Sequence, residues 1–158
     1  PHTLIIRVEK EVPRALVALD KLVYMNARAE IFKEADIDDN KDFPVITGIS
    51  KNNPNMGERL RLAVGLLDTF ESGAAETSLK EISEIHFSED GDVSLYPVGL
   101  PVVVKIGDKG SNFKKRDLVQ LVRHLQKTGR MHRVRSIDLD YPDGAVVSFR
   151  EDGKNEHG

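Results

Sequence analysis

Apolar and polar positions alternate most clearly near the end of the chain. Ile137, Leu139 and Tyr141 are separated by single polar residues, and this period of two predicts a half-buried strand with its apolar side chains on one face. The strand runs into Tyr141-Pro-Asp-Gly144, whose composition predicts a tight turn. Gly144 is expected to adopt the left-handed conformation that a side chain would resist.

The residues after this turn alternate again and complete a predicted hairpin. Val147 and Phe149 share one face of the second strand, while Val146 and Ser148 lie on the other. Residues 151–158 are polar and include two glycines, so we expect a disordered tail that cannot cover the hairpin. The strand after the turn is therefore a candidate open edge of a β-sheet.

Shorter apolar runs earlier in the chain predict further strands, because they are rich in β-branched residues and are bounded by turn compositions. The predicted strands are Leu4–Val8, Ala15–Leu19, Leu22–Met25, Ile31–Phe32, Ile82–Phe87, Val93–Leu95 and Val102–Ile106. The last three should form a meander. Phe43–Gly48 brings four more apolar residues, but it is too short and too closely bounded by Pro and Gly for a helix. We expect it to plug the core from a loop.

Two segments have the apolar spacing of helices. The first predicted helix, Glu58–Phe70, has a wide apolar stripe that includes Leu60, Ala63, Val64 and Leu67. The second, Ser111–Thr128, is capped by Ser111 or Asn112 and ended by Gly129, and its stripe consists of Leu118, Leu121, Val122 and Leu125. Runs of strands outnumber isolated alternations of strand and helix. The predicted fold class is therefore α+β, an antiparallel-dominated curved β-sheet with two helices packed on it.

Length and composition fit one ordinary domain. The chain has 158 residues, of which 39% are hydrophobic and 31% charged, and its net charge of −3 indicates no bulk attraction for nucleic acid or an anionic membrane. Cysteine is absent, which excludes thiol catalysis and thiolate metal sites. No apolar run approaches the ~20 residues of a membrane span, and no signal-peptide pattern is present. Because Pro1 stands where an initiator methionine would, we expect a fragment of a longer protein.

The candidates for chemistry are weak. Asp36–Asp42 has oxygen side chains at alternate positions, as a calcium loop does, but Lys41 and Thr47 stand where that loop needs a glycine and a glutamate. We therefore expect a solvated acidic loop. The five histidines lack the spacing of metal ligands, and the usual nucleophile and nucleotide signatures are missing. The sequence thus predicts no catalytic residue, no metal site and no cofactor.

The segment from Lys114 to Arg135 is strongly basic, with Asp117 as its single acidic residue. A nucleic acid would accept such a surface, but no aromatic residue after Phe113 is interleaved to stack on bases. Basic residues late in a helix also suit its dipole. An anionic protein partner is therefore favoured over a nucleic acid. The basic residues are Lys114, Lys115, Arg116, Arg123, Lys127, Arg130, Arg133 and Arg135.

Several stretches, in this order and spacing, resemble one family. Pro1–Ala15 looks like the passage in which the last strand of a POTRA domain runs into a β domain, and Phe43–Gly48 is similar to an L-P-x-I-x-G segment with Phe43 replacing leucine. Val102–Gly107 resembles a V-x-L-G strand, and Ile137–Ala145 resembles a closing I-D-L-R-Y-x-x-G-A hairpin. Together these stretches resemble the FtsQ family of bacterial cell-division proteins, called DivIB in Gram-positive bacteria.

This resemblance implies a scaffold without catalysis in the bacterial divisome. It implies that residues 1–12 are the end of a POTRA-like region, that 13–150 form the FtsQ-like β domain, and that 151–158 are a tail. It further implies the periplasmic domain of a single-pass inner-membrane protein at the division septum, which binds FtsB and FtsL and helps to recruit and regulate septal peptidoglycan synthesis. An alternative is a POTRA-associated module for protein assembly or interaction. A free-standing enzyme or a nucleic-acid domain is the third possibility.

The exposed terminal strand and the resemblance together predict a site for partner docking. An unpaired edge offers backbone N–H and C=O groups that a partner segment can extend by β-augmentation. Phe149 and Tyr141 would be the large apolar anchors, because aromatic residues dominate binding hot spots. The alternative, that both rings fill the core under the sheet, stays open. The predicted partner-binding residues are Tyr141, Asp143, Gly144, Ala145, Val146, Val147, Ser148 and Phe149.

Overall fold

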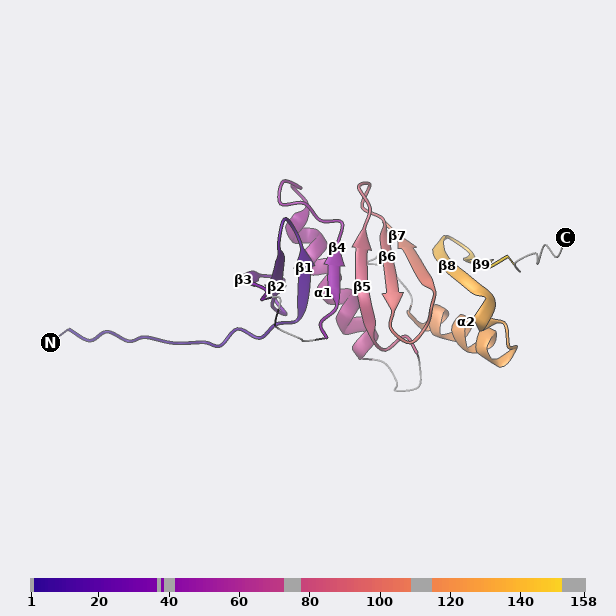
Figure 1. Cartoon of the computed structure of the whole chain (residues 1–158), viewed down its shortest axis with the longest axis horizontal. Coiled ribbons are helices and arrows are strands. Elements are labelled where there is room, and N and C mark those ends of the chain that lie inside the picture. Colours follow the sequence, from indigo (N-terminus) through magenta and orange to yellow (C-terminus); the bar gives the residue numbers. More distant parts are fainter. Residues whose placement is uncertain (1, 37, 39–41, 73–77, 109–114, 152–158) are drawn as a thin grey trace.

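Nine strands form a single sheet, against which two long helices pack (Figure 1). The computed structural model describes residues 2–36, 38, 42–72, 78–108 and 115–151. The helices are α1 (Met56–Glu71), α2 (Lys115–Lys127) and the short 3₁₀ helix η2 (Met131–Arg133). The strands are β1 (Ala15–Ala18), β2 (Leu22–Met25), β3 (Ile31–Glu34), β4 (Val45–Thr47), β5 (Ile82–Phe87), β6 (Val93–Pro97), β7 (Val103–Gly107), β8 (Val134–Tyr141) and β9 (Gly144–Phe149).

The strand order in the sheet is β3-β2-β1-β4-β5-β6-β7-β8-β9. Neighbouring strands pair antiparallel, except for the parallel pairs β1–β4, β4–β5 and β7–β8. The predicted α+β fold, with an antiparallel-dominated sheet and two helices, is confirmed. The meander of β5, β6 and β7 and the terminal hairpin of β8 and β9 are also as predicted.

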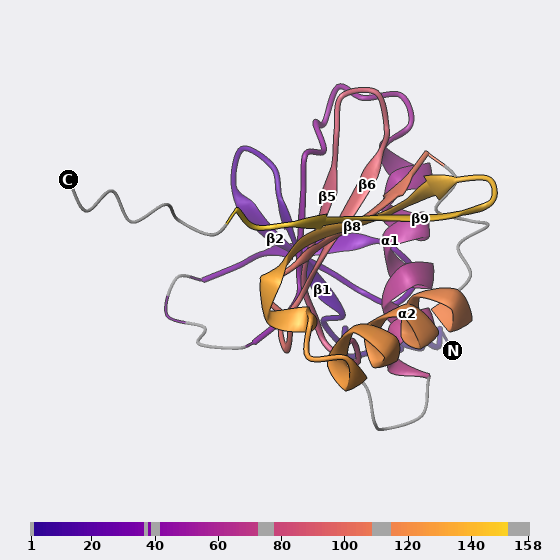
Figure 2. The same ribbon diagram turned by 90° about the vertical axis from the view of Figure 1, so that its right-hand side faces the viewer.

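Both helices lie on the same face of the sheet (Figure 2). Helix α1 connects the parallel neighbours β4 and β5, and α2 connects the parallel neighbours β7 and β8. Strands β5 and β7 point the same way, because each is antiparallel to β6. Two right-handed crossovers that advance in the same direction across a sheet must place their helices on one face. The opposite face of the sheet is called the open face below.

The buried core lies between the sheet and the two helices. Helix α1 contributes Leu60, Ala63, Val64, Leu66, Leu67 and Phe70, and α2 contributes Leu118, Val122 and Leu125. The sheet contributes every second residue of its strands, because alternate side chains point to one face. These include Val17, Ile46, Ile85, Phe87, Val93, Leu95, Val104 and Ile137, all of which are almost completely buried.

The segment Phe43–Gly48 corrects the prediction of a loop that plugs the core. Its central residues form β4, a strand in the middle of the sheet, with β1 on one side and β5 on the other. Ile46 is completely buried, as expected for a residue of the core face. The strand has three residues, too few to show alternation, and its partners lie about 30 and 40 residues away in sequence. Local pattern therefore could not reveal the pairing.

The strand predicted at Leu4–Val8 is absent from the structure. These residues are exposed, and within the described part of the chain they pair with no other strand (Figure 1). A single extended segment has nothing to satisfy its backbone groups except water, so β propensity alone does not make it a strand. Along the described chain, the first side-chain hydrogen bond is at Glu11, whose carboxylate accepts from Asn26 Nδ2 at 3.0 Å. The proposed division between residues 12 and 13 stays a prediction.

The end of α1 depends on charges from elsewhere in the chain. Its last turn contains no basic residue to complement the helix dipole. Lys115, the first residue of α2, donates hydrogen bonds to the carbonyl oxygens of Thr69 at 2.6 Å and Phe70 at 3.0 Å. Burial lowers the pKa of Lys115. Arg14 adds ion pairs at 3.0 Å to Asp68 and Glu71.

We expect replacement of this lysine to destabilise the domain. Lys115→Met keeps the aliphatic chain but removes the hydrogen bonds to α1, and it should lower the free energy of unfolding by about 1–2 kcal/mol. Urea unfolding followed by circular dichroism measures this. Lys127→Met is the matched control, because Lys127 is an exposed residue in the last turn of α2. Equal losses in the two variants would contradict a special role for Lys115.

Candidate functional site

Strand β9 is one of the two edges of the sheet, and it is regular along its length. Its neighbour is β8, with Ile137 opposite Val147 and Asp138 opposite Val146. The register shifts twice, and at each shift β8 advances one residue more than β9. Both irregularities therefore belong to β8, and β9 keeps an unbroken alternation. No strand of the described chain pairs with its other side.

The outward backbone groups of β9 follow from one hydrogen bond. Arg150 N–H donates to the carbonyl oxygen of Arg133 at 2.7 Å, so Arg150 directs its backbone groups toward β8. In an antiparallel strand, the residues that face one neighbour alternate with those that face the other. Ser148 and Val146 therefore also face β8. The residues whose N–H and C=O groups point away from the sheet are Phe149, Val147 and Ala145.

The side chains of β9 separate onto the two faces of the sheet. Val147 lies opposite the completely buried Ile137 and packs partly against the core, so it belongs to the helix-covered face. Val146 lies opposite Asp138 on the open face and is 45% exposed. Phe149 is 42% exposed and Tyr141 is 51% exposed. Neither aromatic ring is therefore enclosed in the core, and both are accessible to another molecule.

The turn between β8 and β9 differs from the prediction in one respect. Tyr141 pairs with Gly144, which leaves Pro142 and Asp143 as the two turn residues. Gly144 does not have the positive φ that was expected, and Asp143 does not have one either. Proline holds φ near −65°, and a turn of the type I geometry continues with a second residue of negative φ. Gly144 is therefore the first residue of β9, and the turn does not need it in the left-handed conformation.

The opposite edge of the sheet is less suited to accept a strand. Strand β3 has four residues, and its pairing with β2 is interrupted by an irregularity at Tyr24 and Met25. The edge also carries charge, because Lys21 and Glu34 form an exposed ion pair at 3.0 Å. Short, charged and irregular edges discourage pairing with another chain. Of the two edges, β9 is the one that presents an unprotected row of backbone groups.

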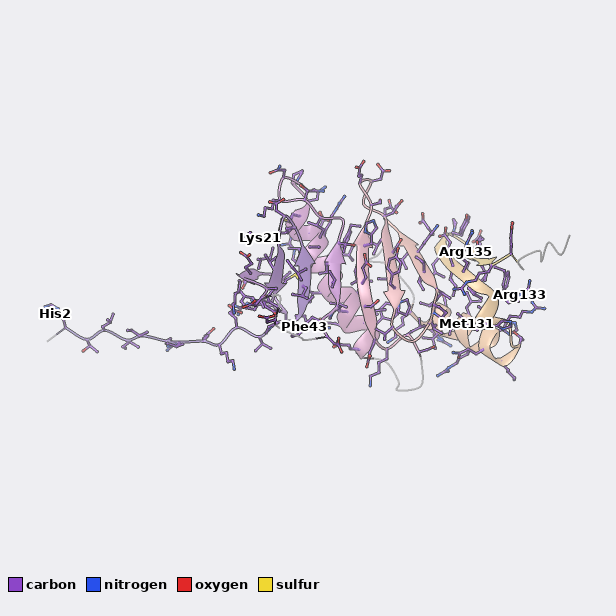
Figure 3. All side chains as sticks on the ribbon, viewed as in Figure 1. His2, Lys21, Phe43, Met131, Arg133 and Arg135 are labelled. Atoms are coloured by element: carbon purple, nitrogen blue, oxygen red, sulfur yellow. The ribbon has the colours of Figure 1, made fainter. Side chains whose placement is uncertain are left out.

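Basic residues are frequent along the segment from α2 to the start of β8, and the start of β8 pairs with the end of β9 that lies away from the turn. Arg123 and Lys127 come from α2, and Arg130 precedes η2. Arg133 ends η2 and Arg135 belongs to the start of β8 (Figure 3). All five side chains are exposed. The acidic residues Asp138, Asp140 and Asp143 lie toward the turn. Some predictions fall on residues outside the described part of the chain. These are residue 114 of the basic segment, the helix caps Ser111 and Asn112, residues 37 and 39–41 of the acidic loop, and residues 152–158 of the tail.

Within the described ranges, no three His, Cys, Asp or Glu side chains converge as metal ligands would. The most concentrated polar cluster on the open face joins β4 and β5. Thr47 Oγ1 lies 2.6 Å from Glu84 Oε1 and 2.8 Å from His86 Nδ1. Both groups contact the same hydroxyl, whereas a nucleophile needs a base that is itself oriented by a third group. The cluster therefore ties two parallel strands together and lacks the order of a catalytic triad.

The fold is that of an α+β domain in which β9 is an edge strand of the described sheet. The family model described as "Cell division protein FtsQ/DivIB, C-terminal" matches residues 15–140. The chain therefore belongs to the FtsQ/DivIB family of cell-division proteins. The matched range begins at β1 and ends within β8, so β9 lies just beyond it.

Three curated relatives are each described as "Cell division protein FtsQ". The relative from Geobacter sp. (strain M21) is 34% identical over 152 residues, and that from Geotalea daltonii is 31% identical over 152 residues; each alignment covers 93% of this chain and 54% of the relative. The relative from Syntrophotalea carbinolica is 30% identical over 154 residues, which are 94% of this chain and 54% of the relative. The chain thus spans about half the length of the relatives that it matches. No described helix is long and apolar enough to cross a bilayer.

Proposed function

We propose that this chain is the partner-binding domain of a non-catalytic divisome scaffold, and that β9 receives an extended segment of a partner protein. The partners are FtsB and FtsL, and the assembly helps to recruit and regulate septal peptidoglycan synthesis. The domain lies in the periplasm, held at the septum by a single membrane helix of the parent protein. Membership of the FtsQ/DivIB family supports the divisome role.

The unpaired edge of β9 is the observation that supports docking by β-augmentation. Strand β9 is an unprotected edge on which Ala145, Val147 and Phe149 direct their backbone groups outward. A partner strand that satisfies these groups gains affinity from the backbone, and the neighbouring side chains add selectivity. Tyr141 and Phe149 are half-exposed aromatic residues near the two ends of this row, where they can anchor the partner. The eight residues predicted from the sequence, Tyr141 and 143–149, fall along this one hairpin.

Truncation of the anchor tests this proposal. Phe149→Ala should weaken binding of the FtsB periplasmic segment by about 2 kcal/mol, or roughly 30-fold in Kd. Because the ring is already 42% exposed, the melting temperature should fall only slightly. Isothermal titration calorimetry and thermal unfolding provide the two measurements.

Phe32→Ala is the matched control for this experiment. Phe32 lies on β3 at the other edge of the sheet, where its ring stacks on Tyr24 at 6.1 Å. Its loss should reduce stability but leave the affinity for FtsB unchanged. If Phe149→Ala unfolds the domain, the ring belongs to the core. If Phe149→Ala binds FtsB as tightly as the parent chain, Phe149 is no anchor.

A further inference from the structure

An open apolar groove lies at the same end of the sheet as the last residues of β9. It has a volume of about 500 Å³ and is formed mainly by the connection between β6 and β7. Val98 stands out in it as a large apolar side chain that is 60% exposed. The remaining lining comes from Ser83, Tyr96, Pro97 and residues 99–103. The groove is shallow, so its shape suits apolar side chains of a peptide better than an enclosed small molecule.

Arg150 connects the docking edge to this groove. Its backbone N–H bonds to Arg133 next to the end of β9, while its guanidinium Nη2 donates to the carbonyl oxygen of Pro101 at 2.8 Å. Pro101 is part of the groove wall. The side chain of Arg150 therefore reaches from the edge strand, past the start of β8, to the groove. It remains exposed, so its other guanidinium N–H groups can donate hydrogen bonds to an acidic residue of a partner.

Strand spacing sets how far a partner would have to extend. Adjacent strands lie about 4.8 Å apart, so a strand added beside β9 is three spacings, or about 14 Å, from β7. An extended chain advances about 3.3 Å per residue and covers this distance in four or five residues. A partner segment that continues past Arg150 thus needs only a short extension to enter the groove.

We propose that the partner segment does not end at the docking strand but crosses Arg150 with an acidic residue and places one or two apolar side chains in the groove beside Val98. This inference rests on the proposed function, because it takes β9 as the docking edge. It adds a second contact site and a sequence pattern for the partner: an extended docking strand, then an acidic residue, then apolar residues. Such a pattern distinguishes the partner from any other strand that could pair with an open edge.

Two substitutions in this chain test the second contact. Val98→Ser removes apolar surface from the groove, and Arg150→Gln removes the charge while keeping a hydrogen-bond donor. Each should weaken binding of the full periplasmic FtsB polypeptide by about tenfold, which corresponds to a single good interface contact. Val12→Ser is the matched control, because Val12 is exposed but enters the sheet from the β1 side, far from β9. It should leave the affinity unchanged.

Shortening the partner makes the test specific. FtsB polypeptides truncated from either end in steps of about five residues should lose affinity when the flank that occupies the groove is removed. The Val98→Ser variant and the parent chain should bind that truncated polypeptide equally well. The truncation has already removed the contact with Val98, so the two changes are not additive. Val147→Pro removes an outward N–H of β9 and therefore tests docking at the edge itself. If Val98→Ser and Arg150→Gln bind the full periplasmic FtsB polypeptide normally while Val147→Pro abolishes binding, the proposed contact with the groove is overturned and docking at β9 stands. If Val147→Pro also binds normally, both proposals fail.

Discussion

Gly48→Ala should be the most destabilising glycine-to-alanine substitution among the glycines that the structure describes. Gly48 follows β4 directly and has φ of +75°, a conformation that costs a residue with a side chain roughly 1–3 kcal/mol. A Cβ there would also collide with the carbonyl oxygen of Phe87 on the neighbouring β5 and lie 2.9 Å from its carbonyl carbon. Both obstacles belong to the backbone of the central sheet, which cannot move aside as a flexible side chain can.

We expect the two effects together to lower the free energy of unfolding by at least about 3 kcal/mol. The melting temperature should then fall by roughly 6–12 °C, or the variant should fail to accumulate as folded protein. Thermal unfolding followed by circular dichroism gives the result.

Substitutions at two other glycines separate the effect of backbone strain from that of the steric collision. Gly129 has φ of +68° but no atom within 4 Å of an added Cβ, so Gly129→Ala measures the backbone strain alone, about 1 kcal/mol. Gly65 is an exposed residue within α1 with open space around it, and Gly65→Ala should stabilise the helix by about 0.5–1 kcal/mol. A Gly48→Ala variant no less stable than Gly129→Ala would show that β5 does not approach β4 as closely as described.

Val147→Pro should abolish binding of the FtsB periplasmic segment. The N–H of Val147 points away from β8, at the centre of the outward row of Ala145, Val147 and Phe149. Proline removes this donor and places its ring where the added strand would run, while the hydrogen bonds between β9 and β8 remain. The loss of an N–H and the steric block together should raise Kd by more than about 100-fold.

The control for this variant keeps the donor. Val147→Ala retains the N–H and should reduce affinity only about threefold to tenfold, through the smaller side chain. Ser148→Pro provides the opposite case, because the N–H of Ser148 faces β8 and its loss should destabilise the hairpin. If Val147→Pro binds FtsB like the parent chain while it remains folded, β9 is not the docking edge. If it melts as early as Ser148→Pro, the assignment of the outward N–H is wrong.

Replacing Arg150 by an acidic residue would change both its contact with Arg133 and its contact with the groove. Arg150 fixes the end of β9 through its backbone and reaches the groove through its side chain. For this reason the substitution chosen above is glutamine, which is shorter than arginine but keeps a side-chain N–H donor and introduces no negative charge. A lost affinity with an unchanged melting temperature then reports the missing guanidinium group and not a displaced strand.

The terminal hairpin could be predicted from the sequence because its pattern is local. The alternation of Ile137 and Leu139 with polar residues identifies the core face in the middle of β8, and Ile137 is indeed completely buried. The predicted face of Tyr141 is wrong, because the register shift between Asp138 and Tyr141 turns that side chain to the open face. The same reasoning left open whether Tyr141 and Phe149 fill the core. The exposure of Tyr141 follows from an irregularity of β8, and no local pattern of apolar residues records a register shift between strands.

The strand β4 shows the limit of local patterns. Three residues bounded by Pro44 and Gly48 carry no periodicity, yet they occupy the centre of the sheet because β1 and β5 both pair with them in parallel. Leu4–Val8 shows the converse, since its composition favours a strand but no described strand is placed beside it. Pairing, and not propensity, decides whether an extended segment becomes part of a sheet.

By itself, the sequence determined the order of most elements, their type, the buried faces of both helices and the open character of the last strand. These properties follow from side-chain periodicity and from turn residues, which act over a few positions. Three other features became clear from the folded molecule: which edge is protected, which N–H groups point outward and how Arg150 links β9 to the groove. Each of these depends on the register between residues far apart in sequence, and a shift of one residue would reverse every face.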